Sequence, residues 1–436
     1  MNEEILNFNI DSLGERTLPS PVATSNFTSD NKRVLFNTGL HNYNAFLTSE
    51  GLPLSLELAG PRDKIYFDPA TAKAAIATCG GLCPGINDVI RAIVMGLHHR
   101  YGVTNIVGIR YGFQGLIPRY GHEILTLTPE AVQDIHTLGG SILASSRGKQ
   151  DIGEMVTALK RMNIDLFFCI GGDGTMRAAG LIADEIHRRK WNISVIGIPK
   201  TIDNDLNLIE KTFGFDTAIS EAIKAVQCAH VESKGAPMGI GLVKLMGRQS
   251  GHIAVCAALA QNDANFVLIP EVPFDLEGEK GFLKALEERL RKRKHCVILV
   301  AEGAAQELIR TDDTPVETDA SGNLRLIDIG VFLRTKIEDH FKKIGMEINL
   351  KYIDPSYMIR SVRSDAGDSI YCGALGLYAV HAGMAGKTGM LVGLMRDEYV
   401  HIPIRMVTFG KKVDPDSTLW QRVLESTGQP NMKNDE

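Results

Sequence analysis

The sequence of 436 residues has no excess of positive charge and no long apolar run. Its formal net charge is −5, so the chain has no overall basic field that would attract nucleic acid or an acidic membrane surface. No apolar stretch approaches the roughly 20 residues that a membrane-spanning helix needs. The first residues, Met1–Glu4, are acidic, and no apolar signal core is present. We therefore expect a cytoplasmic protein that binds neither nucleic acid nor membrane.

Cysteine is scarce as well. The seven cysteines are an odd number and lack the paired spacing of a structural metal site. Cys79 and Cys83 are near each other, but no His or Cys cluster accompanies them to complete a zinc site. Reduced thiols in a cytosolic protein are the better interpretation. The length allows one large or two medium domains of ordinary globular composition.

One stretch has the pattern of a ligand site at the edge of an α/β sheet. Residues 166–170 form a short apolar run that ends in glycines, as a buried parallel strand does. A segment with helical spacing follows at 176–189, and 194–198 is a second short apolar run. The loops at the carboxyl ends of such strands are where open α/β sheets bind ligands.

Both loops of this unit carry groups suited to phosphate chemistry. The first, Gly171-Gly-Asp-Gly-Thr175, lets the backbone approach an anion and leads into a helix N-terminus. Asp173 beside a phosphate needs an intervening cation, usually Mg²⁺. The second loop, Lys200-Thr-Ile-Asp-Asn-Asp205, would point Asp203 and Asp205 to the same side if extended, and such a carboxylate is a candidate base. Taken alone, the first loop also fits a simple tight turn.

Two further glycine-containing loops are candidates for phosphate contact. Strand 74–78, loop 79–87 and helix 88–100 form another phosphate cradle, which is not a Walker loop because no Gly-Lys-Ser/Thr follows. The loop 139–148 carries Arg147 between small residues, which suits bidentate phosphate contact. Its spacing alone fits a solvated arginine equally well.

The pairing of the two loops around 171–175 and 200–205 resembles the 6-phosphofructokinase family. A Gly-Gly-Asp-Gly-Thr loop also occurs in lipid kinases and NAD kinases, but those have no reason to carry Lys200–Asp205 together with Met246-Gly-Arg248. A non-catalytic metabolite sensor on the same fold would be expected to lose Asp203 or Arg248, and both are present. The likeness covers roughly residues 74–410.

The resemblance implies an α/β protein of two Rossmann-like three-layer lobes, with mostly parallel sheets and the active site in the cleft between them. Residues 1–73 would be an N-terminal extension lying on the surface, as in the longer-chain subgroup of the family. The nucleotide-binding lobe would comprise 74–214 and 360–410, and the sugar-phosphate lobe 215–359 and 411–436.

The implied reaction is MgATP-dependent phosphorylation of fructose 6-phosphate at its 1-hydroxyl, a step of glycolysis that gives fructose 1,6-bisphosphate. Asp203 would take the hydroxyl proton, and Asp173 would act through Mg²⁺. Arg147 and Arg248 would stabilise charge on the transferring phosphoryl group. The remaining ATP-side residues implied are Gly80, Gly148, Gly172, Gly174 and Thr175. The remaining residues implied on the sugar-phosphate side are Thr201, which is also counted as catalytic, Met246, Gly247, Glu302, Lys351, Tyr357 and Arg360.

The sequence departs from the shorter bacterial pattern at the implied 6-phosphate site. Lys351 stands where those enzymes have Arg, Tyr357 where they have His, and Gly239 where they have a second Arg. These forms fit the longer-chain subgroup. In the family a neighbouring subunit helps to hold this phosphate, and Lys351 matches one such position. We therefore expect an allosteric enzyme that forms a homo-oligomer, and more specifically a tetramer.

Two positions bear on the phosphoryl donor. Relatives that use pyrophosphate carry Lys before Thr-Ile-Asp, and Lys200 agrees with them. They also place an Asp after the Asp of the first loop, where this chain has Gly174. A carboxylate there would fill the space for the α-phosphate of a nucleotide and repel it, by roughly 4 kcal/mol at about 4 Å. We therefore expect ATP as the donor, with pyrophosphate as the alternative.

Overall fold

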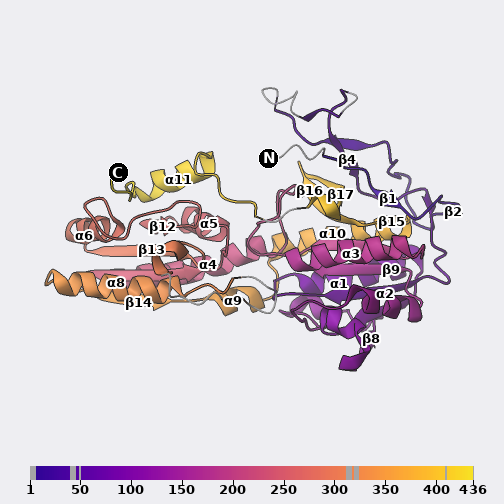
Figure 1. The fold of residues 1–436 in the computed structure, drawn as a ribbon, viewed down its shortest axis with the longest axis horizontal. Coiled ribbons are helices and arrows are strands. Elements are labelled where there is room, and N and C mark those ends of the chain that lie inside the picture. Colours follow the sequence, from indigo (N-terminus) through magenta and orange to yellow (C-terminus); the bar gives the residue numbers. More distant parts are fainter. Residues whose placement is uncertain are drawn as a thin grey trace. The chain divides into compact units, whose positions relative to one another are not determined.

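The computed structural model describes residues 6–39, 46–48, 51–310, 317–318, 324–407 and 410–435. The chain forms two compact α/β units, each with its own sheet (Figure 1). Unit 1 comprises Met1–Thr201, Leu206–Gly214 and Ser361–Phe409, and unit 2 comprises Ile202–Asp205, Phe215–Arg360 and Gly410–Glu436. Within the described ranges, no helix is both long enough and apolar enough to cross a membrane.

Unit 1 is built on a nine-stranded sheet with the order β3-β4-β17-β16-β10-β9-β6-β7-β8. The neighbouring strands from β16 to β7 are parallel, and the strands outside them pair antiparallel. The strands are β3 (Arg33–Leu35), β4 (Ser55–Leu58), β17 (Glu398–Pro403), β16 (Met390–Met395), β10 (Ser194–Pro199), β9 (Leu166–Gly171), β6 (Lys73–Thr78), β7 (Asn105–Ile109) and β8 (Ile124–Thr126). Every residue of β9 and β10 is buried, as their uninterrupted apolar runs predict.

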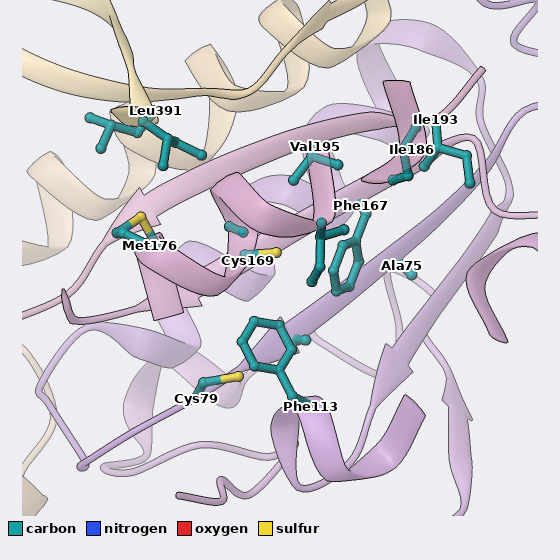
Figure 2. Packing of buried hydrophobic residues seen from close by; sticks show 14 of the residues in the cluster. Ala75, Cys79, Phe113, Phe167, Cys169, Met176, Ile186, Ile193, Val195 and Leu391 are labelled. Atoms are coloured by element: carbon teal, nitrogen blue, oxygen red, sulfur yellow. The ribbon is translucent and has the colours of Figure 1, made fainter. Parts of the chain in front are cut away.

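Helices cover both faces of this sheet. Phe167, Cys169 and Val195 on one face share a buried cluster with residues of α2 (Ile152–Arg161) and α3 (Asp173–Arg188), including Met176 and Ile186 (Figure 2). On the opposite face, Gly383 of α10 (Ala366–Met384) packs against Leu166, Phe168 and Ile196, which alternate with the first set along their strands. Helix α1 (Ile86–Met95) packs on α10 and continues as a π-helical turn at Gly96–Tyr101. Unit 1 is therefore a three-layer unit; its 3₁₀ turns are Gly112–Leu116, Pro118–Tyr120, Ile135–Thr137 and Ile404–Met406.

The N-terminal segment is more than the surface extension expected from the sequence. Its strands β3 and β4 enlarge the main sheet beside β17, and Leu56 of β4 is fully buried. Short pairings add β1 (Asp11–Ser12) to β15 (Lys387–Thr388) and β2 (Leu18–Pro19) to β5 (Lys64–Ile65). A buried ion pair of 2.6 Å joins Arg62 to Glu57, which also contacts Lys387 at 3.0 Å. Strands as short as these leave little hydrophobic periodicity in the sequence.

Unit 2 contains a parallel four-stranded sheet with the order β12-β13-β11-β14. The strands are β11 (Gly239–Leu245), β12 (Phe266–Leu268), β13 (His295–Ala301) and β14 (Asn349–Ile353). The helices are α4 (Phe215–Gly235), α5 (His252–Gln261), α6 (Phe282–Arg293), α7 (Gln306–Ile309), α8 (Ile329–Lys343), α9 (Ser356–Ser361) and α11 (Thr418–Thr427). Leu242 and Ile298 of the sheet share a core with Phe282 of α6 and Leu333 of α8.

Candidate active site

The turn between β9 and α3 is the expected phosphate loop, but its helix starts earlier than predicted. The helix begins at Asp173 rather than at Met176, because Gly172 already takes the cap position. A Cβ atom on Gly171 would lie 2.2 Å from Oγ1 of Thr175, so the turn requires glycine there. Helix geometry leaves the N–H groups of the first turn without intrahelical acceptors. The N–H groups of Asp173 and Gly174 are therefore suited to bind an anion.

The surroundings of Asp173 suit a metal ion that is bound jointly by the protein and a ligand, rather than one enclosed by protein side chains. Its side chain is 32% exposed and pairs with Arg177 one turn later, with a distance of 2.5 Å from Nε to Oδ1. Among the residues that the structure describes, no group of three or more His, Cys, Asp or Glu side chains could hold a metal ion. Mg²⁺ usually binds through one or two carboxylates together with substrate phosphates and water. Asp173 fits a Mg²⁺ ion held jointly with nucleotide phosphates.

Gly174 borders open space. A Cβ atom built on this residue would meet no other atom within 4 Å. The protein itself thus imposes no steric limit on a larger side chain at this position. A bound ligand could therefore discriminate against an acidic side chain here without any steric conflict at the Cβ atom.

Lys200 ties the loop after β10 to the glycine loop after β6. Its side chain is buried, and its Nζ donates a hydrogen bond of 2.7 Å to the carbonyl oxygen of Gly81. Gly80, at φ +86°, lies beside it and is also bonded to the loop that carries Arg147, through Ser145 and Ser146. The Lys200 N–H donates to the Gly171 carbonyl oxygen at 2.9 Å. Unit 1 therefore brings all of its predicted phosphate loops into one hydrogen-bonded group, with a buried cation among them.

Arg147 and Gly148 follow in that group and are exposed to solvent. Gly148 has φ +101°, so the chain turns sharply just after the arginine. The Arg147 side chain is thus accessible to a ligand that arrives from solution. Thr201, the last residue of its segment in unit 1, accepts a hydrogen bond of 2.6 Å at its carbonyl oxygen from the Thr212 hydroxyl.

The segment Ile202–Asp205 belongs to unit 2, whereas the sequence analysis placed it in the nucleotide lobe. Main-chain hydrogen bonds hold the segment in unit 2: the Asp205 carbonyl oxygen accepts hydrogen bonds of 2.9 Å from the N–H groups of Gly410 and Lys411. Asn204 adopts φ +51°, so the loop is not extended as the side-chain alternation assumed. The carboxylates of Asp203 and Asp205 are nevertheless close enough to interact electrostatically.

Asp203 is the most perturbed carboxyl group of this region. Burial, reinforced by the carboxylates of Asp205 and Glu302, raises the pKa of Asp203 to about 8. Arg248 opposes this shift through a hydrogen bond from its backbone N–H and through its charge. A carboxylate with a pKa near neutral pH is a stronger base than an ordinary Asp, which is the property that proton removal from a hydroxyl needs.

The residues around Asp203 come from the carboxyl ends of two adjacent parallel strands. Met246-Gly-Arg248 follows β11, and Glu302 follows β13. The Glu302 N–H donates to the Leu245 carbonyl oxygen at 2.9 Å, which fixes the two strand ends together. Gly247 has φ +133°, and a Cβ atom there would lie 2.4 Å from the Ser250 carbonyl oxygen, so glycine is required. Burial raises the pKa of Glu302 while Arg248 lowers it.

The implied 6-phosphate residues lie on β14 and α9. Lys351 is an exposed residue of β14. Tyr357 on α9 is 75% exposed, and the Arg360 guanidinium lies 4.7 Å from the centre of its ring. The structure thus places Tyr357 and Arg360 side by side and leaves Tyr357 open to solvent. Residues with this exposure are available to a small anion or to another subunit.

Sequence reasoning missed Arg177, Lys244 and Asp354. Arg177 is four residues after Asp173, a spacing that predicts an ion pair on a helix. Lys244 is the one charged residue of the apolar strand β11, and Asp354 directly follows β14. A charge inside a buried parallel strand is unusual enough to have signalled a buried partner, although the sequence alone does not say which residue that is.

Comparison with known proteins agrees with this arrangement. The family model described as Phosphofructokinase matches residues 73–383. The chain belongs to the phosphofructokinase family. It is 49% identical to an ATP-dependent 6-phosphofructokinase of Borreliella burgdorferi, with 100% of this chain and 99% of that protein covered. It is 47% identical to an ATP-dependent 6-phosphofructokinase of Amycolatopsis methanolica, over 96% of this chain and 94% of that protein.

Solved structures share the fold. A pyrophosphate-dependent phosphofructokinase from Marinobacter aquaeolei superimposes with a TM-score of 0.65 at 21% identity, covering 84% of this chain and 92% of that one. The phosphofructokinase of Pichia pastoris in the T-state gives a TM-score of 0.62 at 21% identity, over 77% of this chain and 37% of that one. At this identity the likeness concerns the two-lobe fold alone.

Replacing Asp203 with Asn should stabilise the protein at neutral and alkaline pH. An unfolded Asp ionises near pH 4, whereas the folded state keeps Asp203 protonated up to about pH 8. The stability that this proton contributes is present below pH 4 and is lost as the pH rises to about 8. Asn has a similar shape and does not ionise. We expect the advantage of Asp203→Asn to grow between these pH values, to the order of 1 kcal/mol or more.

Thermal denaturation of both proteins across that pH range measures this difference. Asp339→Asn, at an exposed position of α8, is the matched control and should show no such trend. If the difference in stability between Asp203→Asn and the wild type is constant from pH 4 to pH 9, the pKa of Asp203 is not raised in the folded protein.

Proposed function

We propose that this chain is an ATP-dependent 6-phosphofructokinase, which transfers the terminal phosphoryl group of ATP to the 1-hydroxyl of fructose 6-phosphate in glycolysis. The observation that carries the proposal concerns Asp203. Its buried carboxyl group accepts a hydrogen bond from the backbone N–H of Arg248 and has a raised pKa. A full-length relative at 49% identity is named for this activity. We assign the donor chiefly to unit 1 and the sugar phosphate chiefly to unit 2, which includes Ile202–Asp205.

Phosphoryl transfer depends mainly on positioning and on stabilising charge. Asp203 accepts the proton of the attacking hydroxyl, and its raised pKa makes it a suitable base near neutral pH. The guanidinium groups of Arg147 and Arg248 stabilise the charge of the transferring group. Asp173 holds Mg²⁺, which when bound neutralises charge on the donor phosphates. The N–H groups of Asp173 and Gly174 in the first turn of α3 bind the donor phosphates, and the loop residues Gly172, Thr175, Gly80 and Gly148 lie beside them.

The sugar phosphate is held by groups of unit 2. Glu302 is suited to accept a hydrogen bond from a sugar hydroxyl, because its carboxyl group is buried beside Arg248. Tyr357 and Arg360 bind the 6-phosphate, since Arg offers a forked set of donors that matches phosphate oxygens. Lys351 supplies a further positive charge, and the turn at Met246 and Gly247 completes the set in unit 2. Thr201, which belongs to unit 1, is also assigned to the sugar phosphate.

We also propose that the enzyme works in the cytoplasm as a homotetramer. The exposed ring of Tyr357 and the exposed Lys351 support a phosphate site completed by another subunit. Sedimentation at the protein concentration of the activity assay tests this proposal. We expect a species of four chains to carry the activity, and a fully active monomer would contradict it.

Asp203→Ala should lower the turnover rate by about 10² to 10⁴, the usual contribution of a general base. Binding of fructose 6-phosphate should change much less, because the binding groups remain. In the wild type, kcat/KM should fall as the pH drops below about 8, since protonation of Asp203 removes the base. Coupled assays and calorimetric binding measure these effects. Near-normal turnover in Asp203→Ala would remove Asp203 from the mechanism.

Gly174→Asp should abolish the use of ATP without impairing folding. The added side chain meets no protein atom within 4 Å of its Cβ. Its charge would lie where we place the α-phosphate of the nucleotide. Like charges about 4 Å apart cost roughly 4 kcal/mol, which is about a thousandfold in affinity. Gly174→Asn, of equal size without charge, is the matched control and should retain most ATP binding.

Lys200→Gly should not improve the use of ATP, because Lys200 holds the Gly81 loop in addition to neutralising phosphate charge. Rates with ATP and with pyrophosphate at matched Mg²⁺ distinguish the donors in all of these variants. A wild-type enzyme that works faster with pyrophosphate would overturn the choice of ATP.

A further inference from the structure

A largely buried lysine lies in an inner strand of the unit 2 sheet. Lys244 is the sixth residue of β11, which has β13 on one side and β14 on the other. Its side chain is only 11% exposed, and it precedes Met246-Gly-Arg248 by two positions. Removing a charge from water in this way is costly unless the charge is paired with good geometry.

Two aspartates provide that pairing. The Lys244 ammonium lies 2.7 Å from Oδ2 of Asp328 and 2.8 Å from Oδ2 of Asp354. Burial alone would lower the pKa of Lys244, but its hydrogen bonds to the two aspartates outweigh burial and raise it. Lys244 is therefore charged at every pH at which the enzyme works. We call Lys244, Asp328 and Asp354 the lysine clamp.

The two aspartates belong to different elements. Asp328 caps α8 by accepting hydrogen bonds from the N–H groups of Gly330 and Val331. Asp354 is the first residue after β14, and its carboxylate accepts from both the N–H and the hydroxyl of Ser356, where α9 begins. Helix α9 carries Tyr357 and Arg360. One arm of the clamp thus leads to α8, and the other leads to the start of the helix that bears the proposed phosphate ligands.

The charges of the clamp also act on Glu302. Lys244 and Arg248 both favour its ionised form, while Asp354 opposes it. The charges of Lys244, of Arg248 after β11 and of Arg360 on α9 therefore all favour the ionised form of Glu302. A change at Asp354 would alter the sugar-phosphate groups, whereas a change at Asp328 would alter the start of α8 and the hydroxyl of Tyr352 on β14.

We propose that the ion pair between Lys244 and Asp354 positions α9 for binding of the sugar phosphate, and that Lys244 and Asp354 are positioning residues for the reaction. This inference rests on the proposed function, because it takes Arg360 and Tyr357 as ligands of the 6-phosphate. Lys244 and Asp354 act through α9 and Glu302.

The test compares two substitutions that each remove one carboxylate from Lys244. Asp354→Asn removes the ion pair between Lys244 and Asp354 but leaves Lys244 paired with Asp328. The Lys244 ammonium therefore keeps a partner, and we expect the protein to fold. Asp328→Asn is the matched control: it removes the same charge, and Asn remains a good helix cap. Thermal denaturation of both variants reports the loss of stability separately from steady-state kinetics.

We expect Asp354→Asn to raise the KM for fructose 6-phosphate about tenfold, which corresponds to about 1.4 kcal/mol. The KM for ATP and kcat should change less than about twofold, since the donor loops and Asp203 are untouched. Asp328→Asn should leave the KM for fructose 6-phosphate within about twofold of the wild type. An unchanged KM in Asp354→Asn, or an equal rise in Asp328→Asn, would overturn the proposal.

A third variant separates this inference from the proposed function. Arg360→Lys keeps a positive charge and leaves the clamp intact but loses the forked geometry that matches phosphate. If Arg360→Lys leaves the KM for fructose 6-phosphate unchanged while Asp354→Asn raises it, the role of Arg360 fails and the clamp stands. If Arg360→Lys raises the KM and Asp354→Asn does not, the clamp fails and the role of Arg360 stands.

Discussion

The complete burial of β9 and β10 is the constraint on which unit 1 depends. Strands buried on both faces are mostly apolar along their length, so most polar groups lie where each strand leaves the sheet. Gly171 and Pro199 mark these two points, and the groups beyond them are Asp173 and Lys200. The backbone bond from Lys200 to Gly171 then fixes the two exits to each other. Unit 2 follows the same rule with Arg248 and Glu302 beyond β11 and β13.

Two lysines stabilise the two units in different ways. Lys200 donates a hydrogen bond from its ammonium to the main-chain carbonyl oxygen of Gly81 and so presents a charge beside the phosphate loops. The Lys244 ammonium lies within 2.8 Å of the carboxylates of Asp328 and Asp354, which neutralise its charge without any ligand. The first arrangement favours an anionic ligand, and the second favours rigidity. The difference follows from what each lysine contacts, although both are largely buried.

Much of the fold and of the candidate site could be predicted because the signals are local. Apolar runs mark β9, β10 and β11, and the glycine turns after them mark the phosphate loops. The helix start at Asp173 was misplaced by three residues because the cap is a glycine, which has no side chain to announce it. The path of Ile202–Asp205 into unit 2 depends on bonds to Gly410 and Lys411, about two hundred residues away, and no local pattern encodes them. The partners of Lys244 were hidden for the same reason.

The pairing of the N-terminal strands has a consequence for the order of events during synthesis. Asp11 pairs with Thr388, and Leu58 pairs with Val400, so these early strands find their places only when the end of the sheet has been made. Until β17 and β4 pair, each has a neighbour on one side only, β16 and β3 respectively, and an unpaired strand edge is the usual starting point for association between chains. Contacts of such long sequence separation also form slowly. During synthesis β3 and β4 therefore emerge long before β17, and this side of the sheet is completed by strands that precede the rest of the sheet in the chain.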